Sequence, residues 1–260
     1  MALYYGLIGW VFVLFINGCS SAANKTLSPP SDTRWVYVEV KNPSPYTRPF
    51  PLEVLYISKK CKRELMSMRD GKHYEKVGYN TIKTPIQQQG TSNIWLAKLA
   101  INGGGPCNWM LSEFTLGIEY ADAKRFGNDL VPGTAVGAHF VFGDNITRRY
   151  FFKLFDSDIT LRPKYYPYIK RYSSIKGSTE KDMLSLFGDS PDFPDYHVKL
   201  KRREGVSVIY SPVVNEYKVA EIIFPYEKGK GEHTKIVYPD GSFTADGRIH
   251  PDFKKMESIK

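Results

Sequence analysis

The chain has 260 residues, of which 42% are hydrophobic, 14% aromatic and 24% charged. This length and composition exclude a collagen, a coiled coil and a wholly disordered chain, and they allow one large domain or two modest ones. A formal net charge of +9 permits acidic partners without naming one. The 18 tyrosines and 15 phenylalanines favour strands.

The first segment of the chain is apolar and ends at a cysteine. Residues 2–16 contain no charged side chain, and Asn17, Gly18, Cys19 and Ser20 follow them. This pattern resembles the signal peptide of a bacterial lipoprotein, which is cut just before a cysteine that carries a diacylglyceryl group. The alternative is an uncleaved membrane anchor, although the apolar stretch is shorter than the roughly 20 residues of a spanning helix.

The lipoprotein resemblance implies a cellular location. Residues 1–18 are then a signal peptide, and Cys19 carries diacylglycerol and an amide-linked fatty acid such as palmitate. In that class, a serine such as Ser20 after the cysteine goes with export to the outer membrane, so we expect a lipid anchor on its periplasmic face. Residues 19–33 are small, polar and proline-bearing, and they predict a flexible tether, with the folded unit starting at Arg34.

The two remaining cysteines, Cys61 and Cys107, form an even pair. In an oxidising periplasm such a pair predicts a disulfide, the alternative being two unconnected buried thiols. The glycines at 103–105 just before Cys107 predict a conformationally demanding turn pinned by that disulfide, with Trp109 packed nearby. Neither cysteine has a C-x-x-C partner, so we expect no zinc site.

The rest of the chain is rich in short strand signals with frequent turns. Residues 34–160 predict an antiparallel β-sandwich-like domain. Residues 161–260 predict a basic and aromatic loop, one short helix at 178–187 and a smaller β-meander, in the same domain or in a second lobe. The expected strands are 35–40, 52–57, 93–101, 114–120, 136–142, 149–155, 196–203, 206–210, 217–224, 234–238 and 242–244.

A run of basic and aromatic residues, broken by two prolines, predicts a loop or an irregular sheet edge that could bind a partner. Its members are Arg162, Lys164, Tyr165, Tyr166, Tyr168, Lys170, Arg171 and Tyr172. A second basic cluster comprises Lys199, Lys201, Arg202 and Arg203. The periplasmic address excludes nucleic acid and leaves lipopolysaccharide phosphates, peptidoglycan carboxylates or an acidic protein. The alternative is an ordinary solvated face.

Catalytic and metal-binding motifs are missing from the sequence. There is no G-x-S-x-G, P-loop, H-E-x-x-H or G-x-G-x-x-G motif, and the five histidines lie singly, so we expect no enzyme, no metal and no cofactor. Asp156 and Asp158 resemble the D-x-D-x-T nucleophile loop of haloacid-dehalogenase-type phosphatases. Too few residues follow before the next acidic pair to hold the helices of that fold, so we interpret both aspartates as turn caps.

The overall plan of lipobox, tether and β domain is similar to that of immunity lipoproteins that accompany type VI secretion lipase effectors. Stretches such as NPSPYTRPFPLEVLYISKKC and NIWLAKLAINGGGPCNW contribute to this resemblance. It implies a non-enzymatic module that binds a toxin effector and blocks it. The alternatives are an envelope lipoprotein that binds lipopolysaccharide or peptidoglycan in a structural or assembly role, and a hydrolase. The sequence sets neither the partner nor the oligomeric state.

Overall fold

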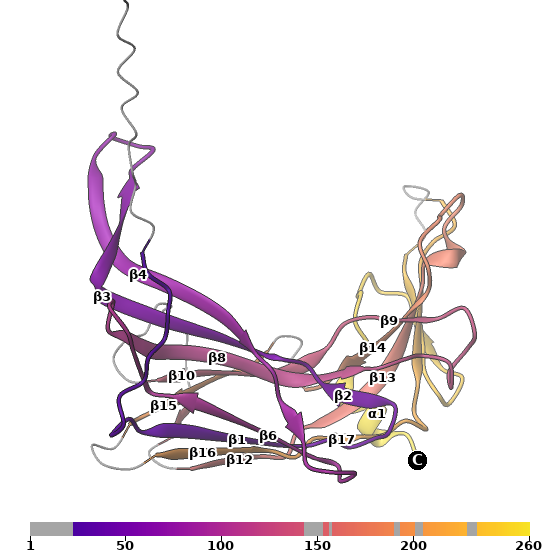
Figure 1. The fold of residues 1–260 in the computed structure, drawn as a ribbon. Helices are drawn as coiled ribbons and strands as arrows, with labels where there is room; N and C mark the ends of the chain where they lie inside the picture. The colour runs from indigo at the N-terminus through magenta and orange to yellow at the C-terminus, as the bar shows by residue number, and fades with distance from the viewer. Residues whose placement is uncertain (1–22, 143–152, 156–157, 190–192, 201–204, 228–232) are drawn as a thin grey trace, which may run out of the picture.

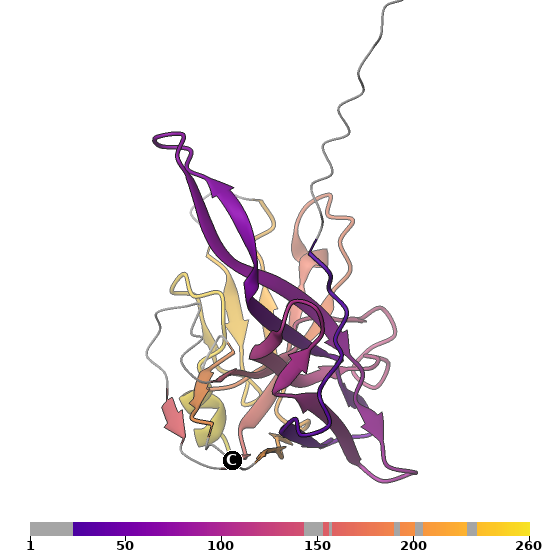
Figure 2. The same ribbon diagram turned by 60° about the vertical axis from the view of Figure 1, so that its left-hand side comes forward.

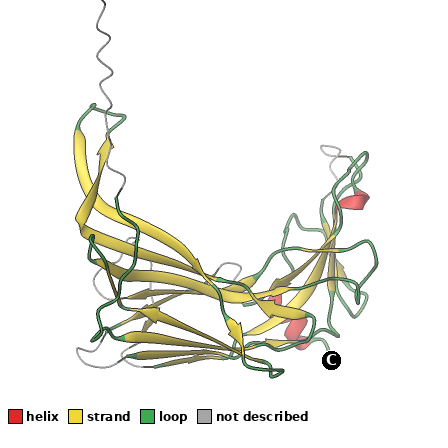
Figure 3. Ribbon diagram, viewed as in Figure 1, coloured by secondary structure: helices red, strands yellow, loops and turns green. Residues whose placement is uncertain are grey.

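Three β-sheets and very little helix make up the molecule in the computed structural model (Figure 1, Figure 3). The structure describes residues 23–142, 153–155, 158–189, 193–200, 205–227 and 233–260. Within these ranges the only helical segments are a 3-10 turn at Tyr172–Ser174 and the helix α1 at Phe253–Ser258. The predicted mainly β, sandwich-like fold is therefore confirmed.

The first two sheets form a sandwich. One contains, in spatial order, β12 (Ile159–Leu161), β16 (Val206–Tyr210), β1 (Trp35–Lys41), β6 (Ile94–Ala100) and β5 (Gln87–Gln88). The other contains β11 (Lys153–Phe155), β15 (Asp195–Val198), β10 (Val136–Phe142), β8 (Trp109–Tyr120), β3 (Leu52–Met66) and β4 (His73–Thr84), with β2 (Thr47–Pro49) and β7 (Asn102–Gly104) paired to β8. Figure 1 shows these sheets as two stacked layers.

Alternating residues of the two sheets build the main core. In β1, Val36, Val38 and Val40 are buried, whereas Tyr37 between them is 51% exposed. In β8, Phe114 lies in the same core and its ring stacks on Phe140 of β10 at 5.0 Å between centroids. Because side chains alternate across a strand, each sheet keeps one face inside and offers the other face to the surroundings.

The third sheet contains β20 (Phe243–Thr244), β19 (Lys235–Val237), β18 (Ala220–Ile223), β13 (Lys164–Arg171), β14 (Met183–Phe187) and β9 (Val131–Pro132), with β17 (Val213–Val214) paired to β13. Its central strand β13 is buried on both faces. Tyr165 and Ile169 belong to the main core, whereas Tyr166 and Tyr168 belong to a second core with Met256 of α1. The third sheet is therefore fixed to the sandwich through β13.

The helix predicted at 178–187 is wrong. Residues 183–187 form β14, which pairs antiparallel with β13 from Met183↔Lys170 to Phe187↔Tyr166. Leu184 and Leu186 enter the main core and Phe187 enters the second one, so the segment has two apolar faces of period two. Pairing and burial on both sides therefore override a local preference for helix.

One further prediction needs correction. The sheets are mixed rather than antiparallel, since β1 pairs with β16 and β10 pairs with β15 in parallel. For residues 161–260, for which the sequence leaves open one domain or a second lobe, β15 and β16 lie in the sheets of the sandwich although they follow β13 and β14 in the chain. The meander expected near the end of the chain is present as the antiparallel run β18–β19–β20.

The predicted disulfide joins Cys61 to Cys107 with a Cα–Cα distance of 5.3 Å. It holds the start of a two-stranded hairpin, since β3 and β4 continue beyond the sheet after Ser58 (Figure 2). The Ser58 hydroxyl donates to the Cys107 carbonyl at 2.6 Å and accepts from the Cys61 amide at 2.8 Å. As expected, Trp109 lies near the disulfide. Gly78 lies between the two, since a Cβ atom on it would lie 1.9 Å from the Cys61 carbonyl oxygen and 3.6 Å from the Trp109 ring.

The tether predicted to be free up to residue 33 is in fact attached to the fold from Asn24 onwards. The Trp109 indole donates to the Asn24 carbonyl at 2.9 Å, and the Ser28 amide donates to the Gly103 carbonyl at 2.8 Å. Gly104 has φ +59° and a Cβ there would lie 2.1 Å from the Ser28 carbonyl oxygen. Gly103 and Gly104 thus end β7, and the expected demanding turn begins at Gly105, whose φ is +71°. The glycine run is also the surface on which the N-terminal segment lies.

We expect the Cys61→Ala/Cys107→Ala double variant to lose about 4 kcal/mol of unfolding free energy, because the open chain regains the entropy of a loop with a sequence separation of 46. Urea unfolding of the oxidised protein and the variant measures this difference. An unchanged midpoint would show that the cross-link does not constrain the unfolded chain.

We expect Gly104→Ala to release the N-terminal segment, because the new methyl group collides with the Ser28 carbonyl. Limited trypsin digestion should then cut after Lys25 several times faster than in the wild type. The matched control is Gly90→Ala, whose φ of +56° carries the same backbone strain while its Cβ meets nothing within 4 Å. Equal cleavage rates in the two variants would contradict the packing role.

Candidate binding groove

The outer face of the eight-stranded sheet carries a groove of about 1070 Å³. Its floor comes from β3, β4, β8, β10 and β15, and in Figure 1 this face lies between the projecting hairpin and the third sheet. The register places Glu53, Thr115 and His139 in one row across three strands, with Leu55 and Glu113 in the adjacent row. These residues alternate with the core residues of the same strands, so they point away from the core.

An acid–histidine–acid cluster lies in the floor of this groove. His139 Nδ1 is 2.6 Å from Asp195 Oδ1, and His139 Nε2 is 3.7 Å from Glu113 Oε2. His139 and Glu113 are each only 8% exposed. Both ring nitrogens therefore face a carboxylate, which is the arrangement that stabilises an imidazolium cation.

The pKa of His139 is raised above its usual value of 6.5. Burial alone would lower this pKa, but the carboxylates of Glu113 and Asp195 outweigh the loss of water. The two carboxylates thus favour the charged form of the imidazole.

Further charges surround the cluster. Glu119 of β8 pairs with Arg48 of β2 at 2.9 Å, and Glu53 of β3 pairs with Lys83 of β4 at 3.6 Å. Because both pairs are exposed, solvent screens them and they contribute little to stability.

Two phenylalanines form an aromatic wall at one end of the groove. Phe50 and Phe193 have ring centroids 6.2 Å apart in an edge-to-face arrangement. They lie over Gly117 and Gly137, which are cross-strand neighbours; a Cβ on either glycine would come within 2.7 Å of a ring. The two glycines are therefore needed for the close approach of the rings to the sheet.

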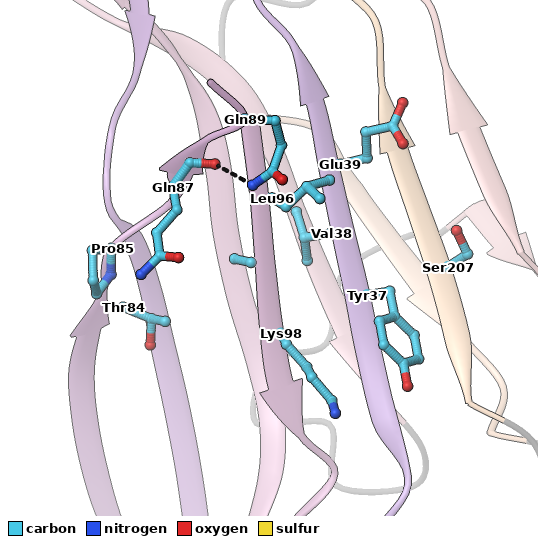
Figure 4. Close-up of a pocket in the computed structure, with 11 residues that line it drawn as sticks. Tyr37, Val38, Glu39, Thr84, Pro85, Gln87, Gln89, Leu96, Lys98 and Ser207 are labelled. Atoms are coloured by element: carbon cyan, nitrogen blue, oxygen red, sulfur yellow. Dashed lines mark hydrogen bonds between the residues drawn. The ribbon is translucent and has the colours of Figure 1, made fainter. Parts of the chain in front are cut away.

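A second, smaller pocket of about 520 Å³ lies on the outer face of the five-stranded sheet. Tyr37, Leu96 and Lys98 line it, and Figure 4 shows Tyr37 and Lys98 extending from the neighbouring strands β1 and β6. Lys98 Nζ lies 3.9 Å from the centroid of the Trp35 ring and 5.5 Å from that of Tyr37. The lining of this pocket is therefore amphipathic, with an ammonium group beside two aromatic rings.

The predicted basic and aromatic surface is wrong for its central tyrosines. Tyr165, Tyr166 and Tyr168 are buried because β13 lies between two cores. The Tyr165 and Tyr210 hydroxyls lie 2.7 Å apart and share a hydrogen bond. Burial raises the pKa of Tyr165 to about 12.

The charged members of that run mostly have partners within the molecule. Arg171 pairs with Glu221 at 2.7 Å and with Asp182 at 3.3 Å, and Lys164 pairs with Glu257 at 3.0 Å. Two other members contact aromatic rings: Tyr172 stacks on Phe224 with ring centroids 5.1 Å apart, and Lys170 Nζ lies 5.7 Å from the centroid of the Tyr168 ring. Arg162 and Lys164 border a third pocket of about 520 Å³. The run is largely structural.

Several predicted residues lie outside the described residues. They are Cys19 with the signal peptide, Asp156, and Lys201, Arg202 and Arg203 of the second basic cluster. Asp158 accepts a hydrogen bond from the Ser207 amide of β16 at 2.7 Å, which is a contact between distant segments and not the expected turn cap. Within the described part of the chain, no group of three or more His, Cys, Asp or Glu residues is arranged so that it could hold a metal ion, and no helix is long and apolar enough to cross a membrane.

The acid–histidine–acid cluster was missed because its members are far apart in the sequence. The available signal was a charged residue inside an otherwise apolar strand: Glu113 in β8 and His139 in β10. Comparison with known proteins adds nothing to this assignment, since no family model, no curated protein and no solved structure matches the chain.

We expect His139→Leu to lower the free energy of unfolding by about 2–3 kcal/mol near pH 6, because two partly buried carboxylates lose their partner. The pKa of His139 is higher in the folded protein than its value near 6.5 in the unfolded chain, so the charged imidazole adds to the free energy of unfolding, and this contribution is complete below pH 6.5. The contribution is lost as the pH rises through the pKa of His139 in the folded protein. The difference from wild type should therefore shrink as the pH rises above 6.5.

Urea unfolding at pH 6 and pH 9 tests this expectation, with His250→Leu, at an exposed position, as the control. A pH-independent difference for His139→Leu would mean that the imidazole is neutral in the folded protein.

Proposed function

We propose that the chain is a lipid-anchored protein on the periplasmic face of the outer membrane that binds and neutralises another protein without catalysis. Its partner is an antibacterial toxin, most specifically a type VI secretion effector of the lipase kind. The plan of lipobox and β domain supports the class, and the groove on the eight-stranded sheet is the observation that supports a binding role. The lipidated residue is Cys19.

The groove favours a protein segment as its occupant. Five strands contribute residues to its lining, and it combines an aromatic wall with carboxylates. Aromatic side chains supply contact area at small cost in conformational entropy, while screened charges at a rim direct the approach of a partner and set its orientation. A projecting segment with an apolar tip and a flanking Lys or Arg fits this lining.

The chemistry of the cluster favours binding over catalysis. A general base needs one ring nitrogen free to take a proton from a nucleophile or a water. In this cluster both nitrogens of His139 face carboxylates, and one of these contacts is only 2.6 Å long. Such an imidazole fixes the charge of the floor instead of moving protons.

Glu119→Arg tests the groove. Glu119 and Glu39 are matched: each lies in a strand, has a side chain 30% exposed and pairs with a nearby cation, but only Glu119 lines the groove. We expect Glu119→Arg to weaken binding to the toxin at least tenfold, because the reversed charge repels the cation of the partner. Glu39→Arg should bind as the wild type does.

The assay begins with deletion of the gene and competition against parental sister cells. The deletion strain should be outcompeted by attackers with an active secretion system and not by attackers without one. Wild type and Glu39→Arg should restore protection, whereas Glu119→Arg and Cys19→Ser should not. A deletion strain that survives attack, with no toxin gene adjacent, rules out the immunity role.

The second pocket favours a different function, an envelope protein that binds lipopolysaccharide or peptidoglycan. Exposed Tyr37 beside Trp35 offers an aromatic surface for a sugar ring, and Lys98 offers a cation for a phosphate or a carboxylate. Retention on purified sacculi that is lost in Tyr37→Ser and kept in Glu119→Arg would support this alternative.

A further inference from the structure

The far half of the β3–β4 hairpin has no core of its own. β3 pairs with β8 only as far as Ile57, and after Ser58 the two strands pair with each other alone, ending at Met66↔His73. Figures 1 and 2 show this ribbon projecting beyond the sandwich. A two-stranded ribbon is marginally stable by itself in water. The disulfide and the hydrogen bonds of Ser58 hold it at its base.

The projecting ribbon is strongly basic. Between residues 59 and 76 it carries seven cations and three acids, a net charge of +4 out of +9 for the whole chain. The cations are Lys59, Lys60, Lys62, Arg63, Arg69, Lys72 and Lys76. Most of these side chains are exposed, so they generate a positive field around the ribbon.

The tip of the ribbon presents apolar side chains to the surroundings. Met68 is 95% exposed and Met66 is 57% exposed. The turn that carries them is ordered, since the Ser67 amide donates to the Lys72 carbonyl at 2.8 Å and the Gly71 amide donates to the Ser67 carbonyl at 2.9 Å. Exposed apolar residues within a ring of cations match the interface of an anionic lipid bilayer, where the charges meet phosphates and the methionines meet acyl chains.

Strand β4, which continues into the ribbon, also contacts the chain segment that leads to Cys19. The Asn80 amide group of β4 donates to the Lys25 carbonyl at 2.8 Å, next to Asn24. From Asn24 back to Cys19 an extended chain spans at most about 18 Å. From Asn80 to His73, where the ribbon ends, a strand covers about 24 Å. The acyl chains and the ribbon tip can therefore reach one membrane surface together.

We propose that the tip of the β3–β4 hairpin is a second membrane contact, which binds anionic phospholipid headgroups and inserts Met66 and Met68 between them. This inference rests on the proposed lipid attachment at Cys19, and the contact fixes how the anchored domain is oriented. The other ligand that such a basic ribbon could take is an acidic protein surface.

Vesicle co-sedimentation tests the contact. The protein is the mature chain from residue 19 with Cys19→Ser, which keeps every residue that the structure describes and has no acyl chain. The vesicles are phosphatidylethanolamine with one quarter phosphatidylglycerol, or phosphatidylcholine alone, at 50 mM and 500 mM NaCl. We expect binding to the anionic vesicles at low salt at least tenfold tighter than to phosphatidylcholine, and loss of this binding at high salt.

Matched variants distinguish the effect of the hairpin tip from the effect of charged or apolar side chains elsewhere on the surface. Met66→Ser/Met68→Ser and Lys60→Glu/Lys72→Glu should each weaken binding to the anionic vesicles at least tenfold. The controls are Val213→Ser/Ile249→Ser, at residues 56% and 58% exposed, and Lys124→Glu/Lys181→Glu, at exposed lysines. The controls should bind as the parent does. Circular dichroism checks that each variant is folded.

The outcomes separate this inference from the proposed function. No binding to anionic vesicles at low salt, or equal binding by the Met66→Ser/Met68→Ser variant, overturns the membrane contact. In the lipidated protein the same hairpin variants should still protect cells, because the acyl chains keep the domain on the membrane. If Lys60→Glu/Lys72→Glu abolishes protection while vesicle binding is unchanged, the ribbon binds an acidic protein and the membrane contact is wrong.

Discussion

The corner around Trp109 holds together three parts of the chain that the sheets alone would not connect. Trp109 is fully buried, and its indole holds the N-terminal segment through the Asn24 carbonyl. Two residues earlier, Cys107 fixes the base of the hairpin through Cys61. One short stretch, comprising β7, the turn after it and the start of β8, therefore sets both the position of the N-terminal segment and the direction of the ribbon. A disulfide alone would limit the distance between two strands, whereas the added hydrogen bonds of Ser58 also set their direction.

A second constraint, the two-sided burial of β13, fixes the third sheet to the sandwich. One face of β13 completes the sandwich through Tyr165 and Tyr210, and the other face builds the second core with α1. The third sheet consequently cannot swing away from the sandwich without opening a core. The groove itself is lined mainly by paired strands of the eight-stranded sheet, with Phe50 and Phe193 at its wall. A lining built on paired strands is preorganised, which lowers the entropy lost when a partner binds.

The sequence predicted the strands of the sandwich well because their signal is local. Trp35 to Val40 is rich in β-branched and aromatic residues, and Val136 to Phe142 is apolar apart from His139. The errors arose where tertiary contacts decide. Tyr165 to Tyr168 looks like a surface run until a second core covers it, and Met183 to Phe187 has an apolar pattern that a helix can also satisfy over so short a length. The His139 cluster depends on a parallel pairing of β10 with β15, which no local pattern encodes.

The groove and the hairpin together suggest why a lipid anchor suits the proposed role. The ribbon rises from the same sheet that forms the floor of the groove, so a membrane contact at its tip would hold the groove at a fixed height and angle above the bilayer. A lipase-type toxin must bring its own catalytic face to the same surface. A binder that is free in solution must find that toxin by three-dimensional diffusion, whereas an oriented binder at the membrane meets it where the effective concentration of both is highest. Orientation by a second contact adds to anchoring, because an acyl chain alone fixes the distance of the domain from the bilayer and not the direction in which its groove opens.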